Sequence, residues 1–465
     1  MAELRLHNYL SKHRETLVPI DPGHVRVYCC GPTVYDLAHI GNARPAVIYD
    51  VLVRLLRRLF PRVTYVRNVT DIDDKINARA AQAGVPIATI TEQTLKDYRQ
   101  DIAALGNIPP DHEPRATETI AEILQIITRL IDSGHAYAAE GHVLFSVPSF
   151  AEYGRFSGRS PDELLAGARV DIAPYKRDPG DFVLWKPSTP DLPGWPSPWG
   201  HGRPGWHIEC SAMSWKHLGE SFDIHGGGTD LIFPHHENEI AQSLCAFPGS
   251  RFARMWVHNG MLVINGEKMS KSTGNFVTIR DVLKKVPAEA ARLLLLKTHY
   301  RSLLDFSDTA LAEARKELDR FYRALERTPA EPSPDLPEPI LAALCEDLNT
   351  PLVIAEMHGL ADRAMAGDQQ ASADLRAAGD ILGLLQESPK DWRQRPLKAS
   401  IVGLIEITAS ITAVLDEPKI DTLVAERIAA RKAKDFAKAD AIRKDLESQG
   451  ISLEDGPEGT IWRRK

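Results

Sequence analysis

The sequence lacks the features of a membrane-bound or secreted protein. No apolar run approaches the roughly 20 residues that a membrane-spanning helix needs. Residues 1–15 lack the apolar core of a signal peptide. Cysteine is scarce, and five cysteines in a chain of 465 residues do not make a disulfide framework. We therefore expect reduced thiols, a cytoplasmic location and no membrane partner.

An excess of positive charge is absent as well. The formal net charge of −7 excludes a protein that is basic over its whole surface. A nucleic-acid partner would therefore need a local basic surface. The hydrophobic content of 43% and the charged content of 26% are typical of a globular protein. A chain of this length is too long for one core, so we expect two to four domains.

The order of elements near the N-terminus predicts a parallel α/β sheet. A short buried strand at 25–30 is followed by a loop rich in glycine and proline. A helix at 46–60 and a strand at 62–70 come next. A strand, loop, helix and strand in this order begin a parallel sheet.

The rest of the chain predicts an insertion and a helical region. Residues 114–200 hold a helix at 117–133, short strands and a run rich in proline, tryptophan and glycine. Helical patterns dominate 287–440, with a proline-rich linker at 331–339. The tail at 450–465 predicts a small β hairpin.

Residues 233–239 read FPHHENE and raise the question of a metal site. On a helix, positions four apart share a face, so His235 pairs with Glu239, whereas His236 and Glu237 would point elsewhere. A glutamate stands where the metalloprotease pattern needs its second histidine. The pair supplies at most two ligands, so a metal site, an acid/base pair and a charged helix start remain open.

Three glycine-marked motifs have the composition of nucleotide-binding loops. HIGN at 39–42 precedes a helix, and the small Gly41 lets an anion approach the backbone. KMSKS at 268–272 is a loop with two lysines that can neutralise a triphosphate. DIHGGGTD at 223–230 ends on Asp230, which can accept hydrogen bonds from a ribose. Taken singly, each motif also fits an ordinary turn or an exposed basic loop.

Three further segments are charged. Basic residues at 427–445 and the WRRK run at 462–465 combine cations with an aromatic, which suits contact with RNA phosphates and bases. A solvated helix face is the alternative for the charge run. DIDDK at 71–75 could suggest a divalent cation site, but an aspartate-rich helix start explains it better.

Together these motifs resemble the cysteinyl branch of the class I aminoacyl-tRNA synthetase family. The resemblance is carried by YCCGPTVYDLAHIGNAR, YVRNVTDIDDKI, PGWHIECSAM, DIHGGGTDLIFPHHENEIAQS, EKMSKSTGN and LEDGPEGTIWRRK. It runs from near residue 28 to the last residue. It implies ATP-dependent attachment of L-cysteine to tRNA(Cys) through a cysteinyl-adenylate, by a monomer that uses Mg²⁺ with ATP.

The resemblance also implies a domain order. We expect a Rossmann-like catalytic domain in two halves around an insertion, then a helical bundle and a small C-terminal α+β domain. The expected bounds are 1–115 for the first catalytic half, 116–200 for the connective insertion, 201–305 for the second half with the KMSKS loop, 306–400 for the helical bundle, and 401–465 for the anticodon-binding domain.

Site residues follow from the resemblance, residue by residue. One zinc ion per chain is implied, with Cys30, Cys210, His235 and Glu239 as its ligands. Cys29, Cys245 and Cys345 are left as buried structural thiols. The other implied positions are His39, Gly41, Asn42, Asp230, Lys268 and Lys271 for ATP, Thr70, Trp206 and His225 for the cysteine pocket, and Trp462, Arg463 and Arg464 for tRNA.

A zinc ion suits the choice between cysteine and serine. Zinc binds a soft thiolate strongly and a neutral hydroxyl poorly, whereas shape alone separates such analogues by roughly 10–200-fold. One position departs from the family, whose HIGN-type signature usually ends in histidine. Asn42 keeps an N–H donor there but cannot carry a positive charge.

Three other functions compete with this interpretation. A ligase that passes cysteine to an amino sugar resembles the zinc and adenylation motifs but lacks the anticodon-binding tail. A catalytically silent RNA-binding paralogue does not need an intact KMSKS motif and all four zinc ligands. A zinc hydrolase needs an open water position, which four protein ligands do not leave.

Overall fold

The computed structural model describes residues 3–159, 173–270, 274–395, 417–456 and 459–464. Contacts between residues divide the chain into two compact units. Unit 1 contains Met1–Ile279, Leu295–Asp305 and Glu338–Val353, and unit 2 contains Arg280–Leu294, Phe306–Pro337 and Ile354–Lys465. No helix among the described residues is both long and apolar enough to cross a membrane.

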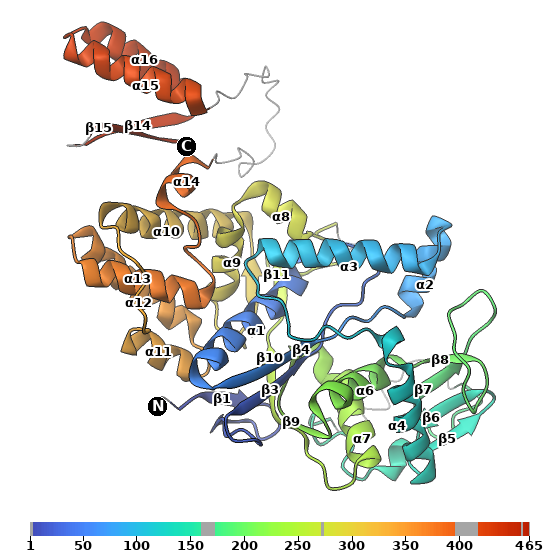
Figure 1. Cartoon of the computed structure of the whole chain (residues 1–465). Coiled ribbons are helices and arrows are strands. Elements are labelled where there is room, and N and C mark those ends of the chain that lie inside the picture. The colour runs from blue at the N-terminus through green and yellow to red at the C-terminus, as the bar shows by residue number, and fades with distance from the viewer. Residues whose placement is uncertain (1–2, 160–172, 271–273, 396–416, 457–458, 465) are drawn as a thin grey trace. The chain divides into compact units, whose positions relative to one another are not determined.

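A four-stranded parallel sheet lies at the centre of unit 1 (Figure 1). Its order is β10–β9–β3–β4, and the predicted parallel α/β sheet is therefore confirmed. Cys29 at the end of β3 pairs with both Gly226 and Arg67, so the carboxyl ends of neighbouring strands meet at one edge. Such an edge is where open α/β sheets bind ligands. The strands are β3 (His24–Cys29), β4 (Arg62–Arg67), β9 (Ser221–Gly228) and β10 (Phe252–Asn259).

Helix α1 (Ile40–Leu59) connects β3 to β4 and begins earlier than predicted. The expectation was a loop up to Pro45 and a helix from residue 46. Instead, residues 40–42 of the HIGN motif form the first helical turn, and Pro45 lies inside the helix. The fixed φ of proline fits a helix, and the cost is one lost backbone hydrogen bond near the helix start.

Strand β4 ends at Arg67 rather than at residue 70, and two helices follow it. They are α2 (Asp74–Ala83), of which only the start at 71–75 was predicted, and α3 (Ile87–Ala104), which was not predicted. In α3 the buried residues Leu95, Tyr98 and Ile102 recur at helical spacing. That spacing was a usable signal in the sequence.

The insertion has its own small sheet and core. The helix predicted at 117–133 is present as η1 (Ala116–Glu118) and α4 (Ile120–Asp132). Four antiparallel strands follow in the order β5–β6–β7–β8. Ile123, Ile127 and Leu130 of α4 pack in one apolar cluster with Phe145 and Trp185 of the sheet. These strands are β5 (Ala136–Ala139), β6 (His142–Phe145), β7 (Phe182–Pro187) and β8 (Gly202–Pro204).

Several smaller elements complete unit 1. They are β1 (Arg5–Asn8), β2 (His13–Thr16), η2 (Val147–Ser149), α6 (Trp206–Leu218), η3 (Thr229–Leu231), η4 (Ile232–His236), α7 (Glu237–Ala246), β11 (Leu262–Ile264), β12 (Glu267–Lys268), β13 (Leu304–Phe306) and α11 (Glu338–Cys345). Helices α6 and α7 matter most for the site, because each carries candidate metal ligands.

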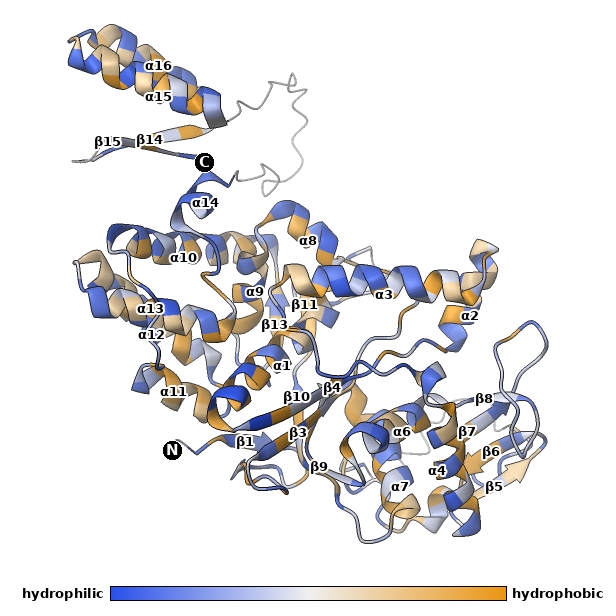
Figure 2. Cartoon of the chain, viewed as in Figure 1, coloured by the Kyte–Doolittle hydropathy of each residue, from blue (hydrophilic) through white to orange (hydrophobic). Residues whose placement is uncertain are grey.

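Unit 2 is mainly helical, as the sequence predicted. Figure 2 shows hydrophobic and hydrophilic residues alternating along α10 and α13, the pattern of helices with one buried face. In α10 the buried positions include Leu311, Leu318, Phe321 and Leu325. The helices of this unit are α8 (Ile279–Lys285), α9 (Ala288–Lys297), α10 (Asp308–Arg327), α12 (Thr350–Met365), α13 (Gln369–Leu382), α14 (Pro389–Gln394), α15 (Glu417–Lys432) and α16 (Phe436–Ser448).

The C-terminal tail forms the predicted hairpin. Strands β14 (Ile451–Gly456) and β15 (Gly459–Arg464) pair antiparallel. Their apolar residues share a core with α15 and α16, which confirms a small α+β element at this end of the chain. The buried members of that core are Ile420, Val424, Leu446, Ile451, Leu453 and Trp462.

Candidate metal centre and active site

The four predicted metal ligands lie together at the carboxyl edge of the central sheet. Cys30 directly follows β3 and Cys210 lies in α6, while His235 lies in η4 and Glu239 follows it by four residues in the first turn of α7. One ligand atom from each lies within 4.8 Å of the others. The distances are 3.8 Å between the Cys30 and Cys210 sulfurs, 3.7 Å from Cys30 Sγ to Glu239 Oε1, and 3.0 Å from His235 Nε2 to Glu239 Oε1.

The spacing of the two sulfurs fits a tetrahedral zinc ion. Thiolate sulfurs bound about 2.3 Å from zinc at the tetrahedral angle lie about 3.8 Å apart. The observed separation between Cys30 and Cys210 is 3.8 Å. Two sulfurs, one imidazole nitrogen and one carboxylate oxygen are ligands that zinc accepts. The geometry and the donor types of these residues therefore fit the predicted ion.

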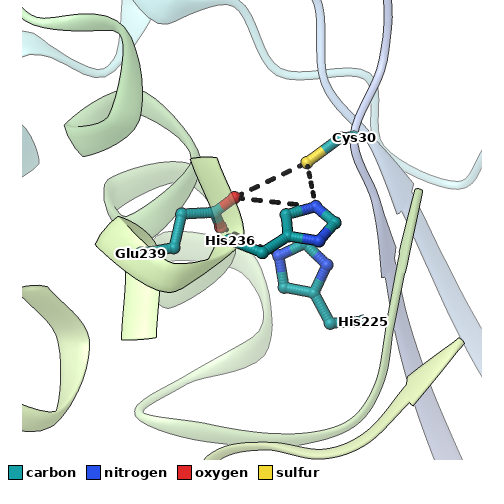
Figure 3. Close-up of side chains that lie close together, drawn as sticks. All are labelled: Cys30, His225, His236 and Glu239. Carbon is teal, nitrogen blue, oxygen red and sulfur yellow. Dashed lines mark hydrogen bonds and ion pairs between the residues drawn. The ribbon is translucent and has the colours of Figure 1, made fainter. Parts of the chain in front are cut away.

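A second group shares two residues with the first. Cys30, His225, His236 and Glu239 also bring one ligand atom each within 4.8 Å of one another (Figure 3). His236 Nε2 lies 3.5 Å from Cys30 Sγ, and His225 Nε2 lies 2.8 Å from Glu239 Oε2. The structure thus surrounds Glu239 with three histidines rather than one.

The prediction that His236 points elsewhere is wrong. Residues 232–236 form a wide π-type turn, and Phe233 has non-helical backbone angles within it. Phe233 precedes both histidines, and after it His236 and Glu239 are three residues apart, a spacing that also makes neighbours on a helix, so both His235 and His236 reach the cluster. The other ring nitrogen of His236, Nδ1, lies 2.8 Å from His258 Nε2.

Charges within the cluster favour metal binding. Burial acts to raise the pKa of the Glu239 carboxyl, but attraction to His225 and His235 outweighs it and lowers that pKa to about 2. Burial also opposes ionisation of Cys210, yet hydrogen bonds from Cys30 and His235 lower its pKa to about 6. Burial and the hydrogen bond to Cys210 raise the pKa of the Cys30 thiol, so the cluster favours the anionic forms of Glu239 and Cys210 in particular.

His207 supports His235 from the neighbouring helix and was missed in the sequence. His207 Nδ1 lies 2.9 Å from His235 Nδ1, so one imidazole donates to the other. Metal-binding histidines usually have their second ring nitrogen held by such a partner. The Trp206 ring stacks on His235 with ring centres 4.3 Å apart. His207 precedes Cys210 by three residues on α6, and that helical spacing was the available signal.

The residues expected in the cysteine pocket border this cluster. Trp206 is 40% exposed beside His235, whereas His225 is fully buried and stacks on Trp256. The Thr70 hydroxyl donates a hydrogen bond to Glu209 Oε2 at 3.2 Å. Thr70 and Glu209 are themselves buried.

The HIGN turn lies beside the chain that follows the KMSKS motif. Ile40 donates its backbone N–H to the Val277 carbonyl at 3.0 Å, and His39 forms a β-bridge with Thr278. A Cβ atom on Gly41 would come within 2.8 Å of the His39 ring and 3.3 Å of Met269 in KMSKS. Glycine therefore permits a close approach between the two motifs.

Of the four other residues expected to bind ATP, the structure describes three. The Asn42 side-chain oxygen accepts from the His39 backbone N–H at 3.1 Å, so asparagine serves as a helix cap here. Lys268 at the end of β12 is exposed, and so is Asp230 after β9. Lys271 lies outside the described residues.

Two glycines of the DIHGGGTD motif make room for protein side chains. A Cβ atom on Gly226 would lie 2.3 Å from the Tyr49 ring, and one on Gly227 would lie 2.9 Å from His236. Packing inside the fold therefore explains both glycines, where the sequence suggested close approach of a nucleotide.

The aspartates of DIDDK have protein partners. Asp73 caps α2 by accepting from the Lys75 backbone N–H. Asp71 accepts two hydrogen bonds from Thr117, and Asp74 forms ion pairs with Lys186 and Arg203. The interpretation of this segment as a helix start is therefore confirmed.

Trp462 is not an exposed stacking surface. It is 3% exposed, and its indole N–H donates to Asp421 at 2.7 Å. Side chains alternate across β15, so Trp462 faces the local core and Arg463 faces the other way, near Glu454. The side chain of Arg464 lies outside the described residues. The exposed aromatic of this region is Phe436, at 61%.

Comparisons with known proteins agree with the motifs. Residues 16–316 match the family model of the class I (C) tRNA synthetase catalytic domain. Residues 417–463 match the model of the cysteinyl-tRNA ligase anticodon-binding domain. A cysteine–tRNA ligase of Acidiphilium cryptum is 63% identical over 466 residues, covering 100% of both chains. One of Gluconobacter oxydans is 60% identical, covering 99% of this chain and 98% of the relative.

A solved structure adds support for the fold alone. Methionyl-tRNA synthetase of Mycobacterium tuberculosis, bound by methionyl-adenylate, has a TM-score of 0.52 against this chain. It is 18% identical in sequence and covers 78% of this chain and 82% of its own. The two chains share the architecture of class I synthetases.

Proposed function

The chain belongs to the class I family of cysteine–tRNA ligases, and on that premise we propose how its site works. The enzyme attaches cysteine to tRNA. In the proposed reaction, the carboxylate of L-cysteine attacks the α-phosphate of ATP and pyrophosphate leaves. The terminal ribose hydroxyl of tRNA(Cys) then attacks the cysteinyl-adenylate, and AMP leaves.

The observation that carries the proposal is the cluster of Cys30, Cys210, His235 and Glu239. Its donor set and its sulfur spacing fit one zinc ion. When bound, zinc would supply a soft Lewis acid that favours the substrate thiol over a hydroxyl. His207 and His225 would hold His235 and Glu239 in orientation through their hydrogen bonds. Selection of cysteine then depends on the placement of these side chains.

ATP is proposed to bind where the HIGN and KMSKS motifs meet. Both reactants must be held in line, and charge on the leaving pyrophosphate must be stabilised. His39 and Gly41 lie at the N-terminus of α1, where backbone N–H groups favour phosphate. Lys268 and Lys271 would neutralise the pyrophosphate, Mg²⁺ would accompany ATP, and Asp230 would meet the ribose. Asn42 would present its N–H₂ group, since its oxygen caps the helix.

The C-terminal α+β element is proposed to bind the anticodon region of tRNA. Phe436 begins α16 and is 61% exposed. The exposed side chains of Lys432, Lys434 and Lys438 surround it in the sequence. An exposed ring among cations can stack on a base while the lysines contact phosphates. Arg463 and Arg464 stay in the proposal as phosphate contacts, and Trp462 becomes a support of the fold.

The competing functions have less support. The match of 417–463 to an anticodon-binding model disfavours a ligase for amino sugars. The complete metal cluster disfavours a silent RNA-binding paralogue, which would not need it. The four protein donors of the cluster disfavour a zinc hydrolase. We also propose that the protein acts as a monomer in the cytoplasm, where its five free cysteines stay reduced.

Exchange of labelled pyrophosphate into ATP tests the proposal most simply. Each amino acid of a panel is added to the full chain, with and without a zinc chelator. We expect exchange with L-cysteine only, and loss of that exchange after chelation that added zinc restores. Exchange with serine at a rate similar to that with cysteine would contradict the proposed role of zinc. Exchange with cysteine at the same rate with and without the chelator would contradict it as well. Exchange without any charging of tRNA(Cys) would favour the amino-sugar ligase.

A further inference from the structure

Glu209 is a buried carboxylate without a cationic partner. It lies on α6 and is 1% exposed. Its hydrogen bond comes from the Thr70 hydroxyl, which donates to Oε2 at 3.2 Å. Within the described part of the chain, no lysine, arginine or histidine forms an ion pair with it. Burial raises the pKa of this carboxyl well above its usual range. A cation from outside the chain would offset that cost and favour the ionised form, so the position is suited to one.

The position of Glu209 relates it to the expected substrate. Trp206 is three residues from Glu209 and four from Cys210 on α6, so each of them is its neighbour on the helix surface, and Glu209 directly precedes Cys210 in the sequence. Cys210 belongs to the metal cluster, and Trp206 stacks on the cluster histidine His235. The backbone of Glu209 therefore directly adjoins that of Cys210, a residue of the cluster.

Thr70 connects the Glu209 carboxylate to the segment that follows Cys30, the second cysteine residue of the cluster. The Thr70 backbone N–H donates to the Pro32 carbonyl, and the Thr70 carbonyl accepts from Val34. These residues belong to the segment that follows Cys30. The Glu209 carboxylate therefore contacts the loop after Cys30 through Thr70 and adjoins Cys210 through its own helix.

We propose that Glu209 binds the α-ammonium group of the substrate cysteine, with the Thr70 hydroxyl orienting the carboxylate. This inference rests on the proposed binding of the cysteine sulfur at the cluster. Only two carbon atoms separate the sulfur of cysteine from its ammonium nitrogen, so a carboxylate beside the cluster can reach that group. A hydrogen bond between two charged groups in a buried site is strong. The pair therefore adds affinity for thiols that carry an ammonium group.

Binding measurements with two thiols test the inference on the zinc-loaded full chain. L-cysteine carries the ammonium group, and 3-mercaptopropionate keeps the thiol and carboxylate but lacks it. Glu209→Gln has nearly the same shape as the native residue and no charge. We expect it to weaken L-cysteine roughly 10- to 100-fold in calorimetric titrations. The affinity for 3-mercaptopropionate should stay unchanged, because its binding does not use the carboxylate.

Zinc content and a second variant separate this role from a structural one. Thr70→Val leaves the carboxylate in place and removes the group that orients it, so it should weaken L-cysteine selectively and to a smaller extent. Thr70→Ser should behave like the native enzyme. If Glu209→Gln loses zinc, the Thr70 variants decide the matter. Equal weakening of both thiols, or no weakening of L-cysteine, would overturn the inference. Failure of the native enzyme to bind L-cysteine would instead overturn the proposed function.

Discussion

At the scale of single residues, spacing and resemblance identified four candidate metal ligands that the structure brings together. His235 and Glu239 paired by helical spacing, and the resemblance supplied Cys30 and Cys210. His236 was not predicted, because that inference considered positions four apart and overlooked that His236 and Glu239, three apart, are also neighbours on a helix. His207 was missed because its role depends on a contact between two helices, which local patterns do not show.

The two overlapping groups in the cluster make different predictions for metal content. Cys210 belongs only to the group with paired sulfurs, and His236 belongs only to the other. We expect Cys210→Ser to lose nearly all bound zinc, because serine is a poor donor to this metal. We expect His236→Asn to keep about one zinc per chain. Elemental analysis of the purified variants measures both. Zinc loss in His236→Asn together with zinc retained in Cys210→Ser would instead favour the group of His225 and His236.

A prediction also follows from the exposed ring of Phe436. Phe436→Ala should raise the KM for tRNA roughly 5- to 100-fold, since stacking contributes about 1–3 kcal/mol per base. Pyrophosphate exchange should stay unchanged, and Phe436→Trp should charge tRNA normally. Steady-state charging kinetics give these values. An alanine variant with native kinetics would show that the ring does not contact the tRNA.

At the scale of elements, local patterns predicted strands and amphipathic helices, and tertiary contacts decided their ends. Helix α1 extends through Pro45 because the packing of its buried face outweighs one lost hydrogen bond. Strand β4 stops at Arg67, and the Asn68 side chain instead accepts from the backbone of Gly31. Trp462 was expected to contact tRNA but is buried in the local core. The run WRRK alone does not show which face of the hairpin packs against the helices.

The ion pair between Arg427 and Asp455 ties α15 to the C-terminal hairpin. The Arg427 side chain is 4% exposed and donates to both carboxylate oxygens, at 2.8 and 2.9 Å. Hydrogen bonds from Arg427 and Thr460 hold the pKa of Asp455 below its usual range. The pair's stabilisation is therefore present above about pH 4, the ordinary pKa of aspartate, and is lost as pH falls further.

Hydrogen exchange of the hairpin tests this pair. Arg427→Ala should speed amide exchange in residues 451–456 by roughly 5- to 30-fold at neutral pH, which corresponds to about 1–2 kcal/mol. The difference from the native chain should shrink as Asp455 becomes protonated, which can be followed by pulse labelling after incubation at low pH. Lys297→Ala, in a different part of the chain, serves as the control. Native exchange rates in the Arg427 variant would contradict the assignment.

At the scale of the whole molecule, the order of strands, loops and helices was enough to predict the parallel sheet, the insertion and the helical region. Other segments gave weaker signals, as the missed helix α3 and the unpredicted extent of α2 show. The adenylation motifs and metal ligands all lie in unit 1, and the proposed anticodon contacts lie in unit 2. The two parts of the reaction are therefore separable along the chain.

Removal of residues 401–465 tests that separation. We expect the shortened chain to keep most of its cysteine-dependent pyrophosphate exchange, because the deletion removes no residue of the metal cluster or of the ATP motifs. Charging of tRNA(Cys) should fall by at least about 100-fold, in line with the loss of several base and phosphate contacts. Both rates are measured on the same preparation. Equal loss of the two activities would show that the tail supports the catalytic unit.

The central claim is that the metal at Cys30, Cys210, His235 and Glu239 meets the sulfur of the substrate. Replacing zinc by cobalt makes the site visible, because sulfur ligands to Co²⁺ give charge-transfer absorption. The most direct measurement is the absorption spectrum of the cobalt enzyme during titration with L-cysteine and, separately, with L-serine. We predict an additional sulfur-to-metal band with cysteine and an unchanged spectrum with serine. A spectrum that cysteine leaves unchanged would contradict the claim and assign the metal a structural role only.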